Sequence, residues 1–331
     1  MGAENINRKW FPSTWPRIIL KEWSKLGKNI FLSILIPTWN RSDSILTLIE
    51  SSGVVDNPLV EFVIVDNYSE DEIFIKLKRR VLKYSNIRLF RNEANIGMVR
   101  NWNECIVHAE GQWLLLMCSD DLFVSGSVID IIDFINNRVD EPSLIIQDPL
   151  AVRPFIKKSP GAKTVQSINL PIASGNIWHK SISSGLGGFD NRLEYSPDAE
   201  FWNRIAFNYP VFVLNKHIAE YQRNDNSYMW STWEKEDFID QIKIIIECNS
   251  RYKNPKVSNY DLSKQIDDGV WKTYLEILGN TIITKRQHIF NMYFIKTIKI
   301  TNSTIRLYEL TILLIKKIIV NMFRYNLNFN L

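Results

Sequence analysis

Short apolar runs alternate with longer amphipathic stretches between Phe31 and about residue 140. Four runs are typical of buried strands, because each is short, rich in branched or aromatic residues and bounded by polar residues. These predicted strands cover residues 32–36, 60–65, 87–90 and 112–117, with the first ending at Pro37. Helical spacing predicts helices over residues 43–52, after an Asn40/Ser42 cap, and over 72–84, 97–109 and 128–139. This alternation predicts an α/β fold, with a doubly wound, mostly parallel sheet and helices on both faces.

Polar residues follow each predicted strand. They are Thr38 and Asn40, Asp66 and Asn67, Arg91 and Asn92, and Asp120 and Asp121. Open α/β sheets bind ligands at the carboxyl ends of their strands, so these residues predict one crevice for a nucleotide. The chain has no Gly-x-Gly-x-x-Gly and no Walker Gly-Lys-Ser/Thr, which disfavours a Rossmann dinucleotide site or a P-loop.

The strongest chemical signal is the acidic pair Asp120 and Asp121, directly after the apolar run 113–116. Hard carboxylate oxygens suit Mg²⁺ or Mn²⁺, and such ions usually bring a phosphate with them. On these residues alone, an acidic turn that caps the following segment is the competing interpretation.

The remainder of the chain is less regular. Residues 147–190 include the Gly-rich stretches 159–161 and 185–188, which predict loops around an acceptor site. A helix is expected over 199–207 with Asp198 at its start, and residues from about 234 onward are expected to be mostly helical.

Charge and composition narrow the class of protein. The 331 residues are 45% hydrophobic and 23% charged, as in an ordinary soluble globular protein with room for about two domains. Residues 1–30 carry a net +4 and residues 285–331 a net +7, which leaves the middle at −7 because the whole chain is +4. Basic ends can bind anionic lipid or nucleic acid, although solubility alone explains them equally well.

Targeting signals are not apparent. We see no apolar core of a signal peptide, and no apolar run reaches the ~18 residues that a membrane span needs. The three cysteines (Cys105, Cys118 and Cys248) have no metal-ligand spacing and favour a reducing compartment.

Ordered motifs in this chain resemble those of inverting family-2 glycosyltransferases with the GT-A fold. They are Ser33–Arg41, Val63–Asp71, Asn95–Asn101, Gly111–Asp121, and an acceptor-side block made of Gly187–Asp190 and Tyr195–Trp202. The order is that of the family, and the pattern is especially similar to transferases of bacterial O-antigen and capsule assembly. The resemblance implies a GT-A catalytic domain over 31–233, with a nucleotide-binding half (31–122) and an acceptor half (123–233). A basic arm (1–30) would precede it and a helical region (234–331) with a basic amphipathic tail would follow.

The resemblance implies a metal-dependent, inverting transfer from a nucleotide-diphosphate sugar to a glycan hydroxyl. Asp121 would coordinate Mg²⁺ or Mn²⁺, and Asp120 would contact the ribose or the metal. Asp198 would be the catalytic base, although an N-cap role for the helix that follows is compatible with it. The chain departs from the family at Cys118, where an Asp is common, and at Pro197, where a Glu often precedes the base.

Further site residues follow from the same resemblance. On the donor side they are Pro37, Thr38, Asn40, Asp66, Asn67, Asn95, Arg100, Asp120 and Arg223. Asp66 would recognise the base or cap the strand end, Arg100 would contact the base or diphosphate or form a surface salt bridge, and Arg223 would clamp the diphosphate. On the acceptor side they are Trp178, His179 and Glu200. Trp178 and His179 would line the acceptor pocket or, alternatively, pack against each other. Glu200 would support the base or the acceptor.

The C-terminal tail alternates apolar and basic positions. Apolar residues recur at spacings of three and four at Ile305, Tyr308, Ile312, Ile315, Ile319 and Met322, with Arg306, Lys316, Lys317 and Arg324 between them. This pattern predicts a helix on an anionic bilayer surface or a helix packed on the catalytic domain. If the acceptor is linked to a lipid, we expect a cytoplasmic enzyme that is peripheral on the inner face of the plasma membrane. A homo-oligomer is compatible with the sequence.

Two other function classes compete with this interpretation. A non-catalytic protein that binds a nucleotide sugar or a glycan could have the same fold. Nucleic-acid binding is disfavoured, because the body of the chain is acidic.

Overall fold

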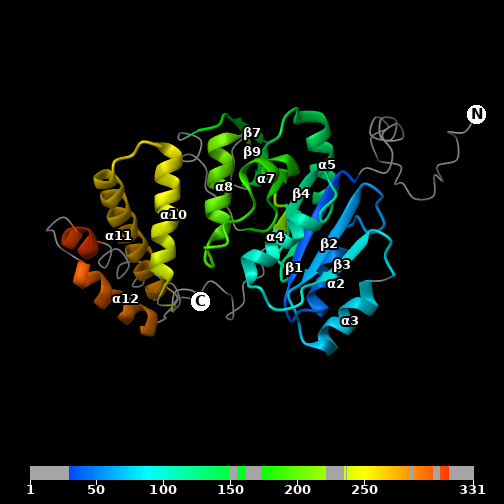
Figure 1. Cartoon of the computed structure of the whole chain (residues 1–331), viewed down its shortest axis with the longest axis horizontal. Helices are drawn as coiled ribbons and strands as arrows, with labels where there is room; N and C mark the ends of the chain where they lie inside the picture. Colours follow the sequence, from blue (N-terminus) through cyan, green and yellow to red (C-terminus); the bar gives the residue numbers. More distant parts are fainter. Residues whose placement is uncertain are drawn as a thin grey trace, which may run out of the picture. The chain divides into compact units, whose positions relative to one another are not determined.

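The computed structural model describes residues 30–81, 83–148, 155–161, 173–220, 235, 237–283, 287–300 and 306–312 (Figure 1). The predicted N-terminal arm therefore lies almost entirely outside the described residues. The chain divides into two compact units, residues 1–223 and 224–331. The division falls before the expected boundary at residue 233, and the functional domain bounds stay a prediction.

The described part of the first unit is built on an eight-stranded sheet of order β3-β2-β1-β4-β8-β6-β9-β7. The strands are β1 (Leu32–Thr38), β2 (Val60–Asp66), β3 (Ile87–Arg91), β4 (Trp113–Leu116), β6 (Leu144–Gln147), β7 (Phe155–Lys158), β8 (Ile177–His179) and β9 (Val211–Leu214). β1 pairs in parallel with β2 and β4, β2 with β3, and β6 with β9. β8 is antiparallel to β4 and β6, and β7 is antiparallel to β9. The predicted mostly parallel sheet is confirmed.

Helices cover both faces of this sheet, as predicted. The first-unit helices are α2 (Asp43–Ser51), α3 (Asp71–Val81), α4 (Met98–His108), α5 (Ser127–Arg138), α7 (Lys180–Leu186) and α8 (Pro197–Asn208). Residues of α2, α3 and α5 pack in one hydrophobic cluster with Ile34 and Ile36 of β1. Residues of α4, α7 and α8 pack in a second cluster with Leu35. Because successive strand residues point to opposite faces, the two clusters lie on the two sides of the sheet.

β1 does not end at Pro37, as the sequence predicted, but continues through it to Thr38. Its pairing with β4 ends at Leu35 opposite Leu116, whereas its pairing with β2 continues to Thr38 opposite Asp66. Leu35 accepts a bond from Met117 on the β4 side, and Thr38 accepts one from Asn67 on the β2 side. The nitrogen of Pro37 therefore points toward β4, but beyond Leu35 and Leu116, the last residues that pair. Because no hydrogen bond between the strands is expected there, the missing N–H of proline costs none.

The segment 147–190 is more ordered than the sequence predicted. Its described residues contain β7, β8 and α7, and β8 inserts between β4 and β6. β8 is only three residues long, so it carries too little periodicity to be recognised from the sequence. A small second sheet pairs β5 (Leu122–Phe123) with β10 (Ala219–Glu220) in antiparallel.

The described part of the second unit is helical, as predicted. It contains α10 (Phe238–Lys253), α11 (Asn259–Ile283), α12 (Gln287–Ile300) and a helical segment over 306–312. That last segment is fixed to α11 by a hydrogen bond from the Trp271 indole to Glu309 and by an ion pair between Arg306 and Asp268. The rest of the predicted amphipathic tail, residues 313–331, lies outside the described residues. None of the helices described here combines the length and apolarity needed to span a membrane.

Candidate functional site

The carboxyl ends of β1, β2 and β3 place three predicted residues side by side. Thr38 lies opposite Asp66, and Asp66 lies opposite Arg91. Thr38 and Asp66 are buried, and Arg91 Nε is 3.5 Å from Asp66 Oδ2. Pro37 lies opposite Val65 one position earlier. The carboxyl ends of β1, β2 and β3 therefore converge as the sequence predicted.

Asp66 caps the turn that follows β2. Its carboxylate accepts hydrogen bonds from the Ser69 hydroxyl and, at 3.1 Å, from the Ser69 backbone N–H. Only 1% of the residue is exposed. The structure thus supports the strand-end cap that the sequence left open, and contact with a nucleotide base stays a prediction.

Ser69 also joins this turn to the loop after β1. Its Oγ accepts the Asn40 N–H at 2.7 Å, and Asn40 Oδ1 accepts the Glu70 N–H at 3.0 Å. Asn40 and Tyr68 both have left-handed backbone angles, with φ of 51° and 62°. Such backbone conformations gather at functional sites, where the surroundings hold them in place. Ser42 is the N-cap residue of α2, as expected, but its side chain makes no capping bond.

Two exposed aromatic residues that the sequence analysis did not select stand at these loops. Trp39 follows β1 and is 55% exposed, and Tyr68 follows β2 and is 53% exposed. The Arg91 guanidinium lies 5.2 Å from the centre of the Tyr68 ring. The sequence did contain a signal that could have identified these two residues, because both lie directly after the polar ends of strands. A planar ligand could stack on aromatic rings at such positions.

Asn67 and Asn95 organise the turn before α4. Asn67 Nδ2 donates to Asn95 Oδ1 at 2.9 Å, and Asn67 Oδ1 accepts the Ile96 N–H at 3.0 Å. Gly97 is the N-cap of α4, with φ of 86°, and no side chain caps this helix. Arg100 is exposed in the first turn of α4 and forms no ion pair with the described residues. The surface salt bridge considered from the sequence is therefore not present among them.

The acidic end of β4 combines a buried and a partly exposed carboxylate. Asp121 is buried and accepts a hydrogen bond from the Ser174 hydroxyl. Asp120 is partly exposed, with its Oδ2 3.6 Å from Arg41 Nη2. These two side chains offer the hard oxygen ligands that the sequence predicted, together with a cation from the loop after β1.

Cys118 lies shortly after the end of β4, and its backbone N–H donates to Ser174 Oγ at 2.9 Å. Burial raises the pKa of its thiol, and the charges of Asp121, Asp120 and Asp198 act in the same direction. All three carboxylates are therefore within electrostatic range of this thiol. The predicted metal ligands and the predicted base thus act on one side chain, although α8 begins far along the chain from β4.

Asp198 occupies the first turn of α8 and is not its N-cap. The N-cap is Ser196, which has a left-handed φ of 53° and makes no capping bond with its side chain. Burial raises the pKa of Asp198 to about 6. Hydrogen bonds from the backbone N–H groups of Ala199 and Asp198 act in the opposite direction and lower the pKa, but burial has the larger effect. A carboxyl with this pKa is mostly ionised at neutral pH and is a competent proton acceptor.

Glu200 is a support within the protein, which agrees with part of its predicted role, and its relation to the acceptor stays a prediction. Its carboxylate is buried and forms two bonds with Arg204, at 2.9 and 2.8 Å. Arg204 also donates to the carbonyls of Leu186 and Gly188 at 2.6 and 2.7 Å. The pair therefore holds the loop between α7 and α8.

Trp178 and His179 were also predicted as acceptor contacts, and both predictions are wrong. Trp178 is fully buried, donates its indole N–H to Ser183 and packs against Phe201. His179 lies opposite Trp113, at the beginning of β4. Because β8 runs antiparallel to β4, His179 lies at the edge of the sheet opposite to Asp120.

Arg223 lies outside the described residues. Within them, no group of three or more His, Cys, Asp or Glu side chains could hold a metal ion. Mg²⁺ is commonly held by one or two carboxylates together with phosphate oxygens of the substrate. Asp121 and the partly exposed Asp120 fit that kind of site.

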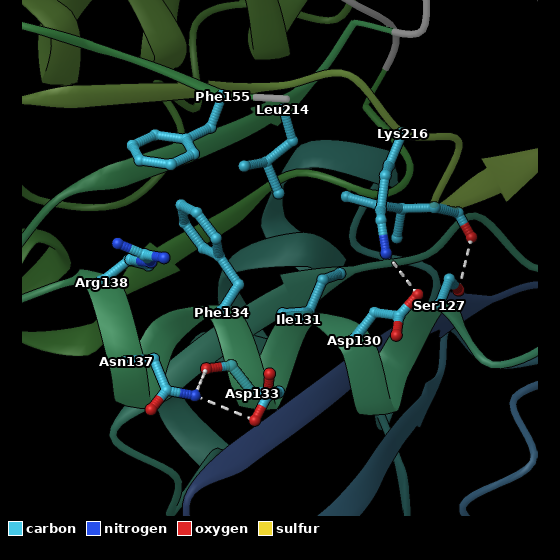
Figure 2. A pocket seen from close by; sticks show the side chains of 11 residues that line it. Ser127, Asp130, Ile131, Asp133, Phe134, Asn137, Arg138, Phe155, Leu214 and Lys216 are labelled. Carbon is cyan, nitrogen blue, oxygen red and sulfur yellow. Dashed lines mark hydrogen bonds and ion pairs between the residues drawn. The ribbon is translucent and has the colours of Figure 1, made fainter. Parts of the chain in front are cut away.

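A separate cavity of about 530 Å³ lies between α5 and the strands β7 and β9 (Figure 2). α5 packs on the other face of the sheet from α8. The cavity's charged residues already have neighbours, since Lys216 pairs with Asp130 at 2.5 Å and Arg138 lies over the Phe155 ring. The cavity is therefore distinct from the acidic site.

Comparison with known proteins matches residues 33–148 to the family described as glycosyl transferase family 2. An uncharacterized glycosyltransferase of Haemophilus influenzae is 31% identical over 94 residues, which are 28% of this chain and 30% of that protein. The uncharacterized glycosyltransferase YwdF of Bacillus subtilis is 25% identical over 191 residues, covering 54% of this chain and 69% of that protein.

Among solved structures, this chain is similar to S. aureus TarS 1–349 in complex with UDP-GlcNAc. The TM-score is 0.54 at 18% identity, and the match covers 82% of this chain and 89% of that one. At this identity the likeness concerns the fold, and it confirms the predicted α/β GT-A fold.

Proposed function

We propose that this chain, whose residues 33–148 match the family described as glycosyl transferase family 2, is a metal-dependent inverting glycosyltransferase. It would move a sugar from a nucleotide-diphosphate donor to a glycan hydroxyl. The observation that carries the proposal is the acidic end of β4, where the buried Asp121 and the partly exposed Asp120 lie with Arg41, while Asp198, in the first turn of α8, is close enough for its charge to act on Cys118. A transfer of this kind needs a site for the diphosphate and a base for the hydroxyl, and the two would be adjacent here.

In the proposed reaction, Asp198 accepts the proton of the acceptor hydroxyl. The hydroxyl oxygen forms a bond to the anomeric carbon as the bond from that carbon to the diphosphate oxygen breaks, and the diphosphate leaves with the electron pair. A single displacement of this kind inverts the anomeric centre. The raised pKa of Asp198, about 6, suits the task, because the group is ionised at neutral pH and still basic enough to take the proton.

The charge that develops on the diphosphate would be met by cations on the donor side. Asp121 and Asp120 would hold Mg²⁺ or Mn²⁺, which when bound neutralises charge on the leaving diphosphate. Arg41 lies beside Asp120, and Arg100 stands in the first turn of α4. The amino end of a helix favours anions, so the start of α4 adds positive potential.

The nucleoside would lie over the loops after β1 and β2. Trp39 and Tyr68 present exposed rings there, and Thr38 and Asp66 form the buried ends of the strands beneath. S. aureus TarS has been solved in complex with UDP-GlcNAc, which supports a nucleotide-diphosphate sugar as the donor class and makes UDP the first nucleotide to test.

For the acceptor, we propose a lipid-linked glycan of bacterial O-antigen or capsule assembly, met at the inner face of the plasma membrane. The net charge of +7 over residues 285–331 favours an anionic surface. On α12, Ile295 and Ile298 are exposed next to Lys296. Exposed apolar residues beside basic ones are typical of helices that lie on anionic bilayers.

The proposed donor is tested by thermal unfolding against a panel of nucleotide sugars, each with and without Mn²⁺. A family-2 transferase is expected to be stabilised by one nucleotide sugar, with a larger shift when Mn²⁺ is present, because the ligand binds only the folded state. Stabilisation followed by no release of nucleoside diphosphate on any glycan acceptor would favour the non-catalytic binding protein. The absence of any shift would contradict the proposal.

A further inference from the structure

One buried hydroxyl joins the acidic end of β4 to the turn before β8. Ser174 is almost fully buried, and its Oγ accepts the Cys118 backbone N–H at 2.9 Å. The same hydroxyl donates to Asp121 Oδ2. The Ser174 hydroxyl thus accepts a hydrogen bond from the segment after β4 and donates one to Asp121, the first choice for a metal ligand.

The turn that carries Ser174 is fixed by its neighbour. Gly175 has a φ of +83° and donates its N–H to Leu116, the last residue of β4, at 2.9 Å. A Cβ at this position would lie 2.8 Å from Gln147 Nε2 and 3.1 Å from Ala219 Cβ. Only glycine fits both the backbone angle and the space, so the turn stays close against β4.

Gln147 anchors the turn from the other side. This buried residue ends β6, and its Nε2 donates to the Ser174 carbonyl at 3.1 Å. Its Oε1 accepts the N–H groups of Ile218 and Ala219, at 2.7 and 3.1 Å. One amide side chain therefore ties the turn before β8 to the beginning of β10.

These contacts close a ring around Asp121. Asp121 is followed directly by β5, β5 pairs with β10 through Ala219 opposite Phe123, and β10 is held by Gln147. Gln147 holds Ser174, and Ser174 holds Asp121. A buried, fully connected polar network of this kind fixes the geometry of its members.

We propose that Ser174 is a positioning residue that, anchored by Gln147, holds the Asp121 carboxylate in the orientation that binds the divalent cation. This inference rests on the proposed function. Groups that hydrogen-bond to a metal-ligating carboxylate orient it, and their loss typically lowers metal affinity by 10- to 100-fold. Neither residue needs to touch the substrate to have this effect.

The experiment measures Mn²⁺ binding calorimetrically in the presence of UDP, for the full chain and three variants. Ser174→Ala removes both hydrogen bonds, and we expect its Mn²⁺ affinity to fall by about tenfold or more. Ser174→Thr retains the hydroxyl and is expected to bind more tightly than Ser174→Ala. Ser143→Ala removes another buried hydroxyl, one that donates to the Glu141 carbonyl at the start of β6, and is expected to match the wild type.

Each outcome bears on a different claim. If Ser174→Ala binds Mn²⁺ as tightly as the wild type, the positioning role is wrong and the proposed function stands. If the wild type binds neither Mn²⁺ nor UDP, the proposed function fails, and this inference fails with it. If Ser174→Ala does not fold, Ser174→Cys, which keeps the size but weakens the hydrogen bonds, is measured in its place against the same expectation.

Discussion

Arg41 and Asp120 form an ion pair of 3.6 Å that links the loop after β1 to the acidic end of β4. Arg41 is thus a basic residue beside Asp120, one of the two predicted metal ligands. Both side chains are partly exposed, so the pair contributes little to folding. Its significance is electrostatic, because it puts a guanidinium where a diphosphate would lie.

We therefore predict that Arg41→Ala weakens donor binding without destabilising the protein. The free energy of unfolding in urea should change by no more than about 1 kcal/mol, as is usual for an exposed pair. The KM for the nucleotide sugar should rise by about tenfold, since hydrogen bonds to charged groups are worth about 1.5–3 kcal/mol. Lys243→Ala, which breaks an exposed pair with Asp240 on α10, should leave KM unchanged. An unchanged KM in Arg41→Ala would exclude a diphosphate contact.

The pH dependence of transfer should report Asp198. Burial raises the pKa of this carboxyl to about 6, and a base acts only when ionised. The value of kcat/KM is therefore expected to level off above pH 6 and to fall about tenfold per pH unit below it. A profile that stays flat down to pH 4.5 would contradict the assignment of Asp198 as the base.

Trp39 offers a test of the nucleoside site. Because its side chain is exposed, Trp39→Ala should leave stability nearly unchanged. Loss of a stacked aromatic ring costs about 1–3 kcal/mol per base, so the Kd for UDP should rise at least fivefold. Tyr260→Ala, which removes an exposed ring on α11, serves as the control and should bind UDP as the wild type does. Equal UDP affinity in both variants would place the base elsewhere.

The Glu200–Arg204 pair is predicted to be a structural element. Arg204→Ala leaves the buried Glu200 carboxylate without that partner and frees the carbonyls of Leu186 and Gly188. Removing one member of a buried pair costs about 3–5 kcal/mol, which urea unfolding would measure. Arg251→Ala, at an exposed pair with Glu247 on α10, should cost less than about 1 kcal/mol. Similar losses in the two variants would contradict the support role.

The sequence predicted the parts of the site that depend on local pattern. Apolar runs located β1, β2 and β4, although not the last residues of β1, and so Thr38, Asp66 and Asp121 were found from the residues beside them. Asp198 was identified through the resemblance of Tyr195–Trp202 to the acceptor-side block of the family, and the helix predicted after it is present.

The sequence failed where placement depends on a short or distant partner. His179 was assigned to the site because the direction of the three-residue strand β8 was unknown. Ser174 and Gln147 were missed because their residue types are common in loops and strands and their partners are far away. Ser174 is 53 residues from Asp121, and Gln147 is 71 residues from Ile218.

The most direct test of the central claim is the Asp198→Asn variant, assayed with the nucleotide sugar that stabilises the wild type best. The claim predicts that the variant binds the donor and Mn²⁺ with wild-type affinity while nucleoside diphosphate release on the acceptor falls by about 10²–10⁴-fold, because the amide cannot take the proton. Transfer at the wild-type rate would contradict the claim that Asp198 is the base of a glycosyl transfer.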